Sequence, residues 1–168
     1  RINLSGRKFH AKRNHISKFK NTYPNFRFEK ITNSNKEDAY KVMLDWCAEN
    51  DIDIENYEEK HAIRESLDNM EEFKMRGGII YVKDKAVAMT LGCEISPIAF
   101  DICFEKALRE YDGIYAVINN EFAKTLSSYK YINREEDMGL EGLKKSKLSY
   151  NPVILLARYN ATLKKDEN

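Results

Sequence analysis

Apolar positions along the chain recur with two different periods, and the changes between these periods predict the secondary structure. Spacings of three and four residues place apolar side chains on one face of a helix, and they mark the segments 7–20, 36–49, 58–74, 115–126 and 139–148. Short apolar or alternating runs are typical of strands, and they cover 26–31, 79–82, 86–91, 98–105, 129–133 and 153–159. Gly77-Gly78 is expected to end a helix and to open the next strand.

The order of these elements predicts the fold class. Asp84-Lys85 is a tight turn that joins the strands 79–82 and 86–91 into a hairpin. Helical segments precede and follow this hairpin region in the sequence. We therefore expect an α/β (α+β) fold, with a mixed central sheet that carries helices on both faces and is preceded by the helix over 7–20.

The composition is that of an ordinary globular domain. The chain has 168 residues, of which 42% are hydrophobic and 33% are charged, and this balance argues against a wholly disordered protein. An apolar run of about 18 residues, the minimum for a transmembrane helix, is missing. The cysteines Cys47, Cys93 and Cys103 lack the spacing of a disulfide framework or a zinc motif. We therefore expect a reducing, cytoplasmic setting and neither a metal nor a cofactor.

Charge is distributed very unevenly along the chain. Residues 1–30 hold nine Lys and Arg against one acidic residue, a net charge of +8, whereas residues 31–72 hold four against thirteen, a net charge of −9. In the predicted helix over 7–20, Phe9, Ile16 and Phe19 form an apolar stripe and basic residues cover the rest. Ser5 is expected to cap this helix.

This basic helix has two interpretations. The first is a polyanion-binding face for tRNA phosphates or an anionic lipid surface, with these candidates: Arg7, Lys8, Lys12 and Arg13. The second is a linker helix that packs on the acidic residues 45–72. We expect a basic linker helix over 1–24, a main domain over 25–160 and a polar tail over 161–168. Because the chain starts at Arg1 rather than Met, we also expect that the protein has an N-terminal partner domain that this sequence does not include.

Two segments have more specific sequences than the order of elements alone provides. These are LSGRKFHAKRNHISKF (4–19) and INREEDMGLEGLKKSKLSYNP (132–152), supported by FEKAL (104–108) and INNEFAK (118–124). With them the chain resembles an uncharacterised bacterial family that is similar to the C-terminal domain of phosphatidylglycerol lysyltransferase. The resemblance implies a GNAT-like acyltransferase fold, the second of two tandem repeats. It also implies a relation to enzymes that move an aminoacyl group from charged tRNA to a lipid or amine acceptor. Two alternatives are a binding module for RNA or an anionic membrane that keeps the fold without catalysis, and a structural half of the tandem repeat.

The polar run after the strand 129–133 contains the first candidate site residues. Asn133 and Arg134 could hold a carboxylate or phosphate, because arginine donates two parallel hydrogen bonds to such groups. Glu135 or Asp137 could accept a proton from an amine or hydroxyl. The alternative for these acids is local, since Asp137 could cap the following helix and acids favour its positive end.

Candidates also occur on either side of this run. Lys144 and Lys147 share a helix face and could contact an anionic substrate, or they could simply face solvent. Tyr150 occupies the place where GNAT-like enzymes often have a tyrosine near the leaving group, or it could pack on the core. Asn119 is expected to face a crevice.

Glu105 is the remaining candidate catalytic residue. Strict alternation in 98–105 would place Phe100, Ile102 and Phe104 on one face and Asp101, Cys103 and Glu105 on the other. Two carboxylates on one face of an interior strand are costly unless they are paired or functional. The structural alternative is an ion pair from Glu105 to Lys106 or to the basic helix.

The resemblance also bears on the acyl donor. GNAT enzymes that use acetyl-CoA have a loop of the form Gln/Arg-x-x-Gly-x-Gly/Ala, whose backbone N–H groups bind the pyrophosphate at a helix N-terminus. The matching stretch is Glu110-Tyr111-Asp112-Gly113-Ile114-Tyr115, in which only Gly113 fits. Two carboxylates would repel the phosphates here. We therefore expect weak binding of acetyl-CoA, so that an acyltransferase of this sequence would more readily depend on aminoacyl-tRNA.

Overall fold

The computed structural model describes residues 4–157, 159, 161 and 162 of the chain. These residues belong to two compact units, Arg1–Glu136 and Asp137–Asn168. The first unit contains the sheet and most of the helices. Among its described residues, the second contains a single helix, α5 (Glu141–Leu148).

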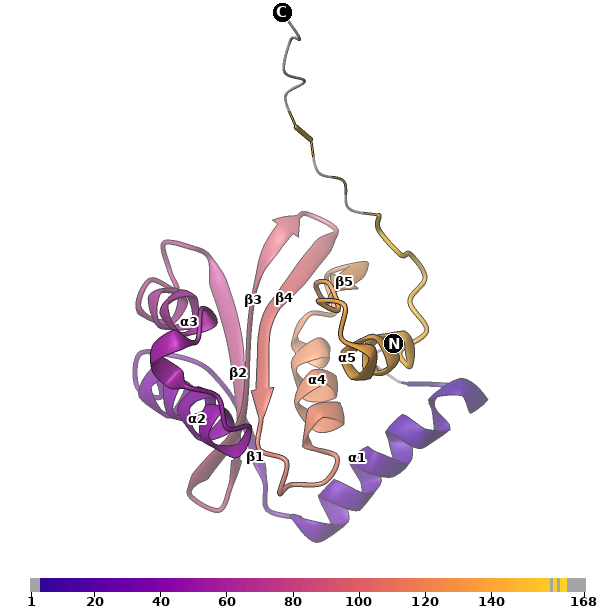
Figure 1. Cartoon of the computed structure of the whole chain (residues 1–168). Coiled ribbons are helices and arrows are strands. Elements are labelled where there is room, and N and C mark those ends of the chain that lie inside the picture. The colour runs from indigo at the N-terminus through magenta and orange to yellow at the C-terminus, as the bar shows by residue number, and fades with distance from the viewer. Residues whose placement is uncertain (1–3, 158, 160, 163–168) are drawn as a thin grey trace, which may run out of the picture. The chain divides into compact units, whose positions relative to one another are not determined.

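Five strands form the sheet of the first unit, in the order of the chain. They are β1 (Arg27–Lys30), β2 (Met75–Val82), β3 (Lys85–Ser96), β4 (Ala99–Ala107) and β5 (Tyr131–Asn133). The first four strands pair antiparallel, whereas β5 pairs parallel to β4 after the crossover through a helix (Figure 1). The predicted mixed sheet is therefore confirmed.

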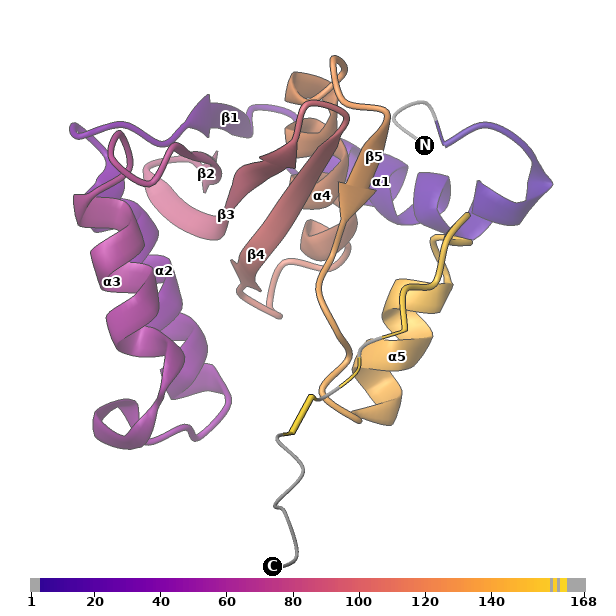
Figure 2. The ribbon, with the colours of Figure 1, turned by 90° about the horizontal axis from the view of Figure 1, so that it is seen from above.

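Helices cover both faces of the sheet, as the element order predicts. Figure 2 shows α2 (Lys36–Glu49) and α3 (Glu59–Asp68) on one side, and α1 (His10–Thr22) and α4 (Ile114–Thr125) on the other. The period-two pattern of β2 explains this division. Ile79 and Tyr81 belong to the core under α2 and α3, and Ile80 and Val82 belong to the core under α1 and α4.

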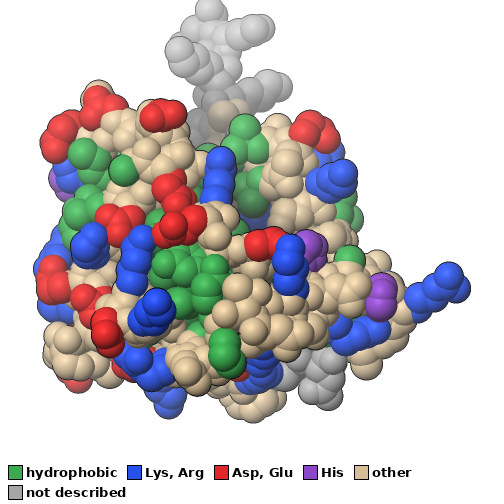
Figure 3. All heavy atoms as spheres, turned by 90° about the horizontal axis from the view of Figure 1, so that it is seen from below, with side chains coloured by type: hydrophobic (Ala, Val, Ile, Leu, Met, Phe, Trp, Pro, Cys, Tyr) green, Lys and Arg blue, Asp and Glu red, His purple; other side chains and the backbone are tan. Residues whose placement is uncertain are grey.

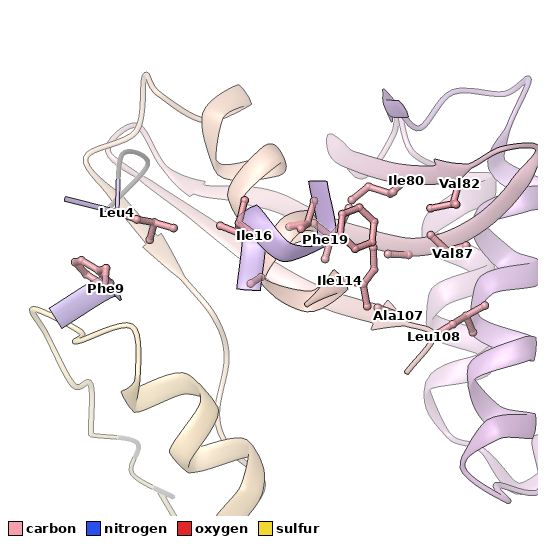
Figure 4. Packing of buried hydrophobic residues seen from close by; sticks show 14 residues of the cluster. Leu4, Phe9, Ile16, Phe19, Ile80, Val82, Val87, Ala107, Leu108 and Ile114 are labelled. Carbon is pink, nitrogen blue, oxygen red and sulfur yellow. The ribbon is translucent and has the colours of Figure 1, made fainter. Parts of the chain in front are cut away.

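The basic helix α1 is part of the first unit's core. Its apolar stripe is buried, and Phe19, with no exposed surface, lies beside Ile80 and Ile114 in the core cluster shown in Figure 4. On the polar side, Lys18 Nζ lies 2.7 Å from an Asp112 carboxylate oxygen and Lys20 Nζ lies 2.8 Å from a Glu121 oxygen. The interpretation that this helix packs on acidic residues 45–72 is therefore wrong, because its acidic partners come from α4 and the loop before it.

The start of α1 also differs from the prediction. Ser5 makes no cap; a short 3-10 turn, Arg7–Phe9, precedes the helix, and Gly6 and Phe9 occupy the capping positions without side-chain hydrogen bonds. Instead, Arg13 Nη1 donates to the carbonyl oxygens of Leu4 and Gly6 at 2.6 and 2.8 Å. Arg13 thus ties the N-terminal segment to the helix.

At three places the observed elements differ from those predicted from the sequence. Gly77-Gly78 lies inside β2 rather than in a turn. Glycine is needed at position 78 because the Phe28 ring packs so closely that a Cβ there would meet it at 2.5 Å. The helix expected over 58–74 ends at Asp68 and continues as turns. The strand expected over 153–159 is not formed in its described residues, 153–157 and 159, because no described strand pairs with them.

Across the described residues, none of the helices is both long enough and apolar enough to cross a bilayer.

Candidate functional site

A β-bulge in β4 determines which side chains reach the α4 face of the sheet. Leu91 pairs with Phe104 and Gly92 pairs with Ile102, so that Cys103 is an extra residue between them. Phe100 and Ile102 pack with α4, whereas Phe104 packs in the core under α2 and α3. The strict alternation predicted for this strand is therefore wrong, because one additional residue reverses the faces beyond it.

Gly92 makes the bulge possible. An ideal Cβ on this glycine would lie 2.0 Å from the carbonyl oxygen of Asp101 on the neighbouring strand. Only a residue without a side chain lets the two backbones approach so closely. The bulge consequently directs Glu105 to the same side as α4.

Glu105 is the centre of a polar cluster on that face. Its Oε1 accepts from Arg134 Nη2 at 2.7 Å, and its Oε2 accepts from Asn119 Nδ2 of α4 at 3.3 Å. The Glu105 side chain is only 10% exposed and that of Arg134 21%. Of the predicted ion-pair partners, Lys106 is excluded, since it donates to Glu59 at 2.6 Å on the other face, whereas Lys12 of the basic helix interacts electrostatically with the Glu105 carboxylate.

Lys12 of α1 completes what we call the Glu105 cluster, which consists of Lys12, Glu105, Asn119 and Arg134. Burial lowers the pKa of the Lys12 ammonium, the Arg134 cation lowers it further, and the Glu105 carboxylate opposes both effects. The cluster thus combines one carboxylate with two cations and carries a net charge of +1 when all three are ionised. Such a set can orient an anionic or carbonyl group on the cations beside a carboxylate that accepts a proton.

Arg134 and Glu135 emerge on opposite sides of the chain after β5. Arg134 reaches the Glu105 cluster, whereas ligand atoms of Asp101, Cys103 and Glu135 all lie within 4.8 Å of one another. Asn133 pairs with Asp101 in the sheet, so their side chains share a face. Of the predicted residues near β5, only Arg134 therefore contacts Glu105, and Glu135 belongs to a separate group.

The group around Cys103 is only partly exposed. Burial raises the pKa of the Cys103 thiol to about 12, and the neighbouring Cys93 and Asp101 add to this effect. Cys93 pairs directly with Asp101 across the β3–β4 ladder. The sequence spacing of these residues gives no sign of the grouping, because it is made by three separate segments.

The other predicted site residues lie in the second unit. Asp137 accepts from the backbone N–H of Gly139 at 3.0 Å, but Leu140 holds the N-cap position of α5, so the predicted Asp137 cap is wrong. Lys144 and Lys147 lie on α5, and Tyr150 follows directly, its N–H donating to the Lys147 carbonyl at 3.1 Å. Their roles toward a substrate remain predictions.

The predicted polyanion-binding residues do not form one uniform face. Arg7 and Lys8 are exposed, Lys12 belongs to the Glu105 cluster, and Arg13 binds backbone carbonyls. Figure 3 shows basic and histidine side chains over the right-hand side of the molecule, where α1 lies in Figure 1. Arg7, His10 and Arg13 line a surface hollow of about 580 Å³ there. Only part of the predicted set is therefore available for an external anion.

The N-terminus of α4, where a CoA pyrophosphate would bind in GNAT enzymes, lies close to the backbone of α1. Asp112 is paired with Lys18, whose ammonium lowers the pKa of the Asp112 carboxyl. An ideal Cβ on Gly113 would lie 2.7 Å from the His15 carbonyl oxygen, so the α1 backbone lies against this turn. The adjoining hollow has a volume of only about 260 Å³.

We therefore expect acetyl-CoA to bind poorly. The α1 backbone leaves little room at Gly113, and the carboxylates of Glu110 and Asp112 stand at this helix end, although three basic side chains also line the hollow. Calorimetric titration checks this, and a dissociation constant near the micromolar range would contradict it.

Comparison with known proteins gives one family and one fold. The family of the C-terminal region of phosphatidylglycerol lysyltransferase matches residues 1–162. A conserved protein of unknown function from Bacteroides thetaiotaomicron has a crystal structure that is 43% identical, with a TM-score of 0.86 over 92% of this chain and 53% of that chain. This chain thus spans about half the length of the Bacteroides protein. No curated protein matches the chain.

More distant structures share the fold alone. A possible acetyltransferase from Clostridium difficile is 14% identical, with a TM-score of 0.62 over 85% of this chain and 99% of that one. A ribosomal-protein-alanine N-acetyltransferase from Brucella melitensis is 9% identical, with a TM-score of 0.56 over 84% of this chain and 99% of that one. The predicted GNAT-like architecture is therefore confirmed.

Proposed function

Because the chain belongs to the family of the phosphatidylglycerol lysyltransferase C-terminal domain, we propose that it is an acyltransferase domain that moves an aminoacyl group from charged tRNA to a lipid or amine acceptor. The observation that carries the proposal is the Glu105 cluster. It places a mostly buried carboxylate between an arginine and an asparagine, next to a lysine whose pKa burial lowers. The close approach of α1 to Gly113, at the N-terminus of α4, favours a donor other than acetyl-CoA.

The proposed reaction needs a proton acceptor and a group that stabilises charge. The Glu105 carboxylate accepts the proton of the attacking hydroxyl or amine, whose lone pair forms a bond to the ester carbonyl carbon. The cations of Arg134 and Lys12 stabilise the negative charge that develops on the carbonyl oxygen. The bond to the tRNA ribose oxygen then breaks, and that oxygen takes up a proton as it leaves.

The whole protein is proposed to contain a second, N-terminal GNAT-like domain. This chain covers 53% of the Bacteroides protein that is 43% identical to it, so a relative of that length has room for another domain. An acceptor or the tRNA acceptor arm would then contact both domains.

The exposed basic residues at the start of α1 are proposed to contact tRNA phosphates. The double variant Arg7→Ala/Lys8→Ala should weaken tRNA binding and reduce the salt dependence by about 0.7–0.9 log units for each phosphate that the variant no longer neutralises. The double variant Lys41→Ala/Lys130→Ala removes the same charge from α2 and the loop before β5, and serves as the control. Equal salt slopes for the two double variants, measured by fluorescence anisotropy, would argue against this interaction.

A second candidate function is a binding module that retains the fold without catalysis. The surface position of Arg7 and Lys8, away from the buried Glu105, favours it. The transfer assay separates the two functions, because a pure binding module would bind charged tRNA without releasing deacylated tRNA in the presence of an acceptor.

A further inference from the structure

Three segments of the chain bring metal-binding side chains together on the sheet face opposite α4. Asp101 and Cys103 come from β4 and Glu135 from the segment after β5, and one ligand atom of each lies within 4.8 Å of the others. Cys93 of β3 pairs with Asp101 and therefore projects from the same face. The group combines soft sulfur with carboxylate oxygen.

We propose that Asp101, Cys103 and Glu135 form a binding site for a zinc ion. Zinc accepts thiolate and carboxylate ligands in tetrahedral geometry, whereas magnesium and calcium prefer oxygen alone. The fourth position is open to water or to the Cys93 thiol. This site is independent of the aminoacyl transfer proposed above, since none of its residues belongs to the Glu105 cluster.

The geometry requires only a small adjustment to accept the metal. Bond lengths of about 2.0–2.3 Å place two ligands of a tetrahedral zinc about 3.3–3.8 Å apart. The three ligand atoms lie within 4.8 Å of one another, so they have to approach by at most about 1.5 Å. Asp101 is fixed in the sheet with 7% of its surface exposed, whereas Glu135 is exposed and can provide the movement.

The local charge favours a divalent cation. Two carboxylates lie beside a thiol, so the group carries negative charge that a divalent cation would neutralise. A bound zinc ion would replace the thiol proton, as metal binding generally does.

Zinc binding can be measured directly on the intact protein. We expect one zinc ion per chain after equilibrium dialysis with a non-thiol reductant, measured by elemental analysis, and a higher melting temperature with zinc but not with magnesium. Cobalt in place of zinc should give a thiolate-to-metal charge-transfer band. Absence of a stoichiometric zinc ion would overturn the proposal.

Variants of the proposed ligands, compared with a cysteine variant elsewhere, test which side chains bind the zinc ion. Cys103→Ser and Glu135→Gln should each lower zinc affinity by tenfold or more, Cys103→Ser should weaken the cobalt band, and the double variant Cys93→Ser/Cys103→Ser should abolish it. Cys47→Ser changes a buried thiol elsewhere and should leave both unchanged. Because Glu135 is exposed, its variant is expected to fold normally. Unchanged zinc binding by both site variants, or a disulfide between Cys93 and Cys103 in the purified protein, would overturn the assignment.

Discussion

Glu105→Gln is expected to lower the rate of aminoacyl transfer by about 10²- to 10⁴-fold, the range that a general base contributes. The amide keeps the size of the side chain, and its oxygen can still accept from Arg134 Nη2. It has no basic carboxylate to receive the acceptor's proton. Single-turnover release of deacylated tRNA by the full-length protein, in the presence of lipid vesicles or a free amine, measures the effect.

Glu110→Gln is the control for this experiment. Glu110 is also a carboxylate in an ion pair, 2.8 Å from Lys85 Nζ, but its side chain is 55% exposed and lies outside the Glu105 cluster. Its variant should retain the wild-type rate within about twofold. If Glu105→Gln were equally active, with tRNA binding unchanged, Glu105 could not be the proton acceptor.

Gly92→Ala is expected to lower the free energy of unfolding by about 3 kcal/mol, at the upper end of overpacking effects. The new Cβ would lie 2.0 Å from the Asp101 carbonyl oxygen, and a backbone atom cannot rotate away as a side chain can. β3 and β4 would have to separate at the bulge. Urea denaturation followed by circular dichroism measures the change.

Gly142→Ala provides the contrast. Gly142 lies within α5, and an ideal Cβ there meets nothing within 4 Å. Alanine is favoured over glycine in a helix by up to about 1 kcal/mol, so stability should be unchanged or slightly higher. A Gly92→Ala protein as stable as this control would mean that the β3–β4 bulge tolerates a side chain.

Most of the fold could be predicted because the periodic signals are strong and local. The stripe of Phe9, Ile16 and Phe19 identifies α1, and all three side chains are buried. The partner of that helix could not be predicted, since charge balance along the sequence suggested the acidic segment 45–72. Burial of Phe19 in the core beside α4 determines the packing of the helix instead. The exposed ion pairs of Lys18 and Lys20 contribute little energy and form where this packing places them.

The candidate site was predictable in its residues but less so in its geometry. Glu105, Asn119 and Arg134 were all expected at a site, and the structure joins them by hydrogen bonds. The face of Glu105 was predicted incorrectly, because the bulge depends on the pairing of β4 with Gly92. The spacing of apolar residues within β4 gives no sign of it. An ion pair from Glu105 to the basic helix was among the alternatives, but Lys12 could not be identified as its partner, since its position within a basic run resembles that of any surface lysine.

A backbone turn directly after β5 separates these two groups. β5 ends at Asn133, and Glu135 has a φ of 51°, in the left-handed region that residues other than glycine seldom adopt. Arg134 comes before this turn and reaches Glu105, while Glu135 lies at the turn and reaches Cys103. Inserting or deleting a residue between β5 and the turn would move Arg134 away from Glu105. In the descent of this family, the chain length at this point should therefore stay constant.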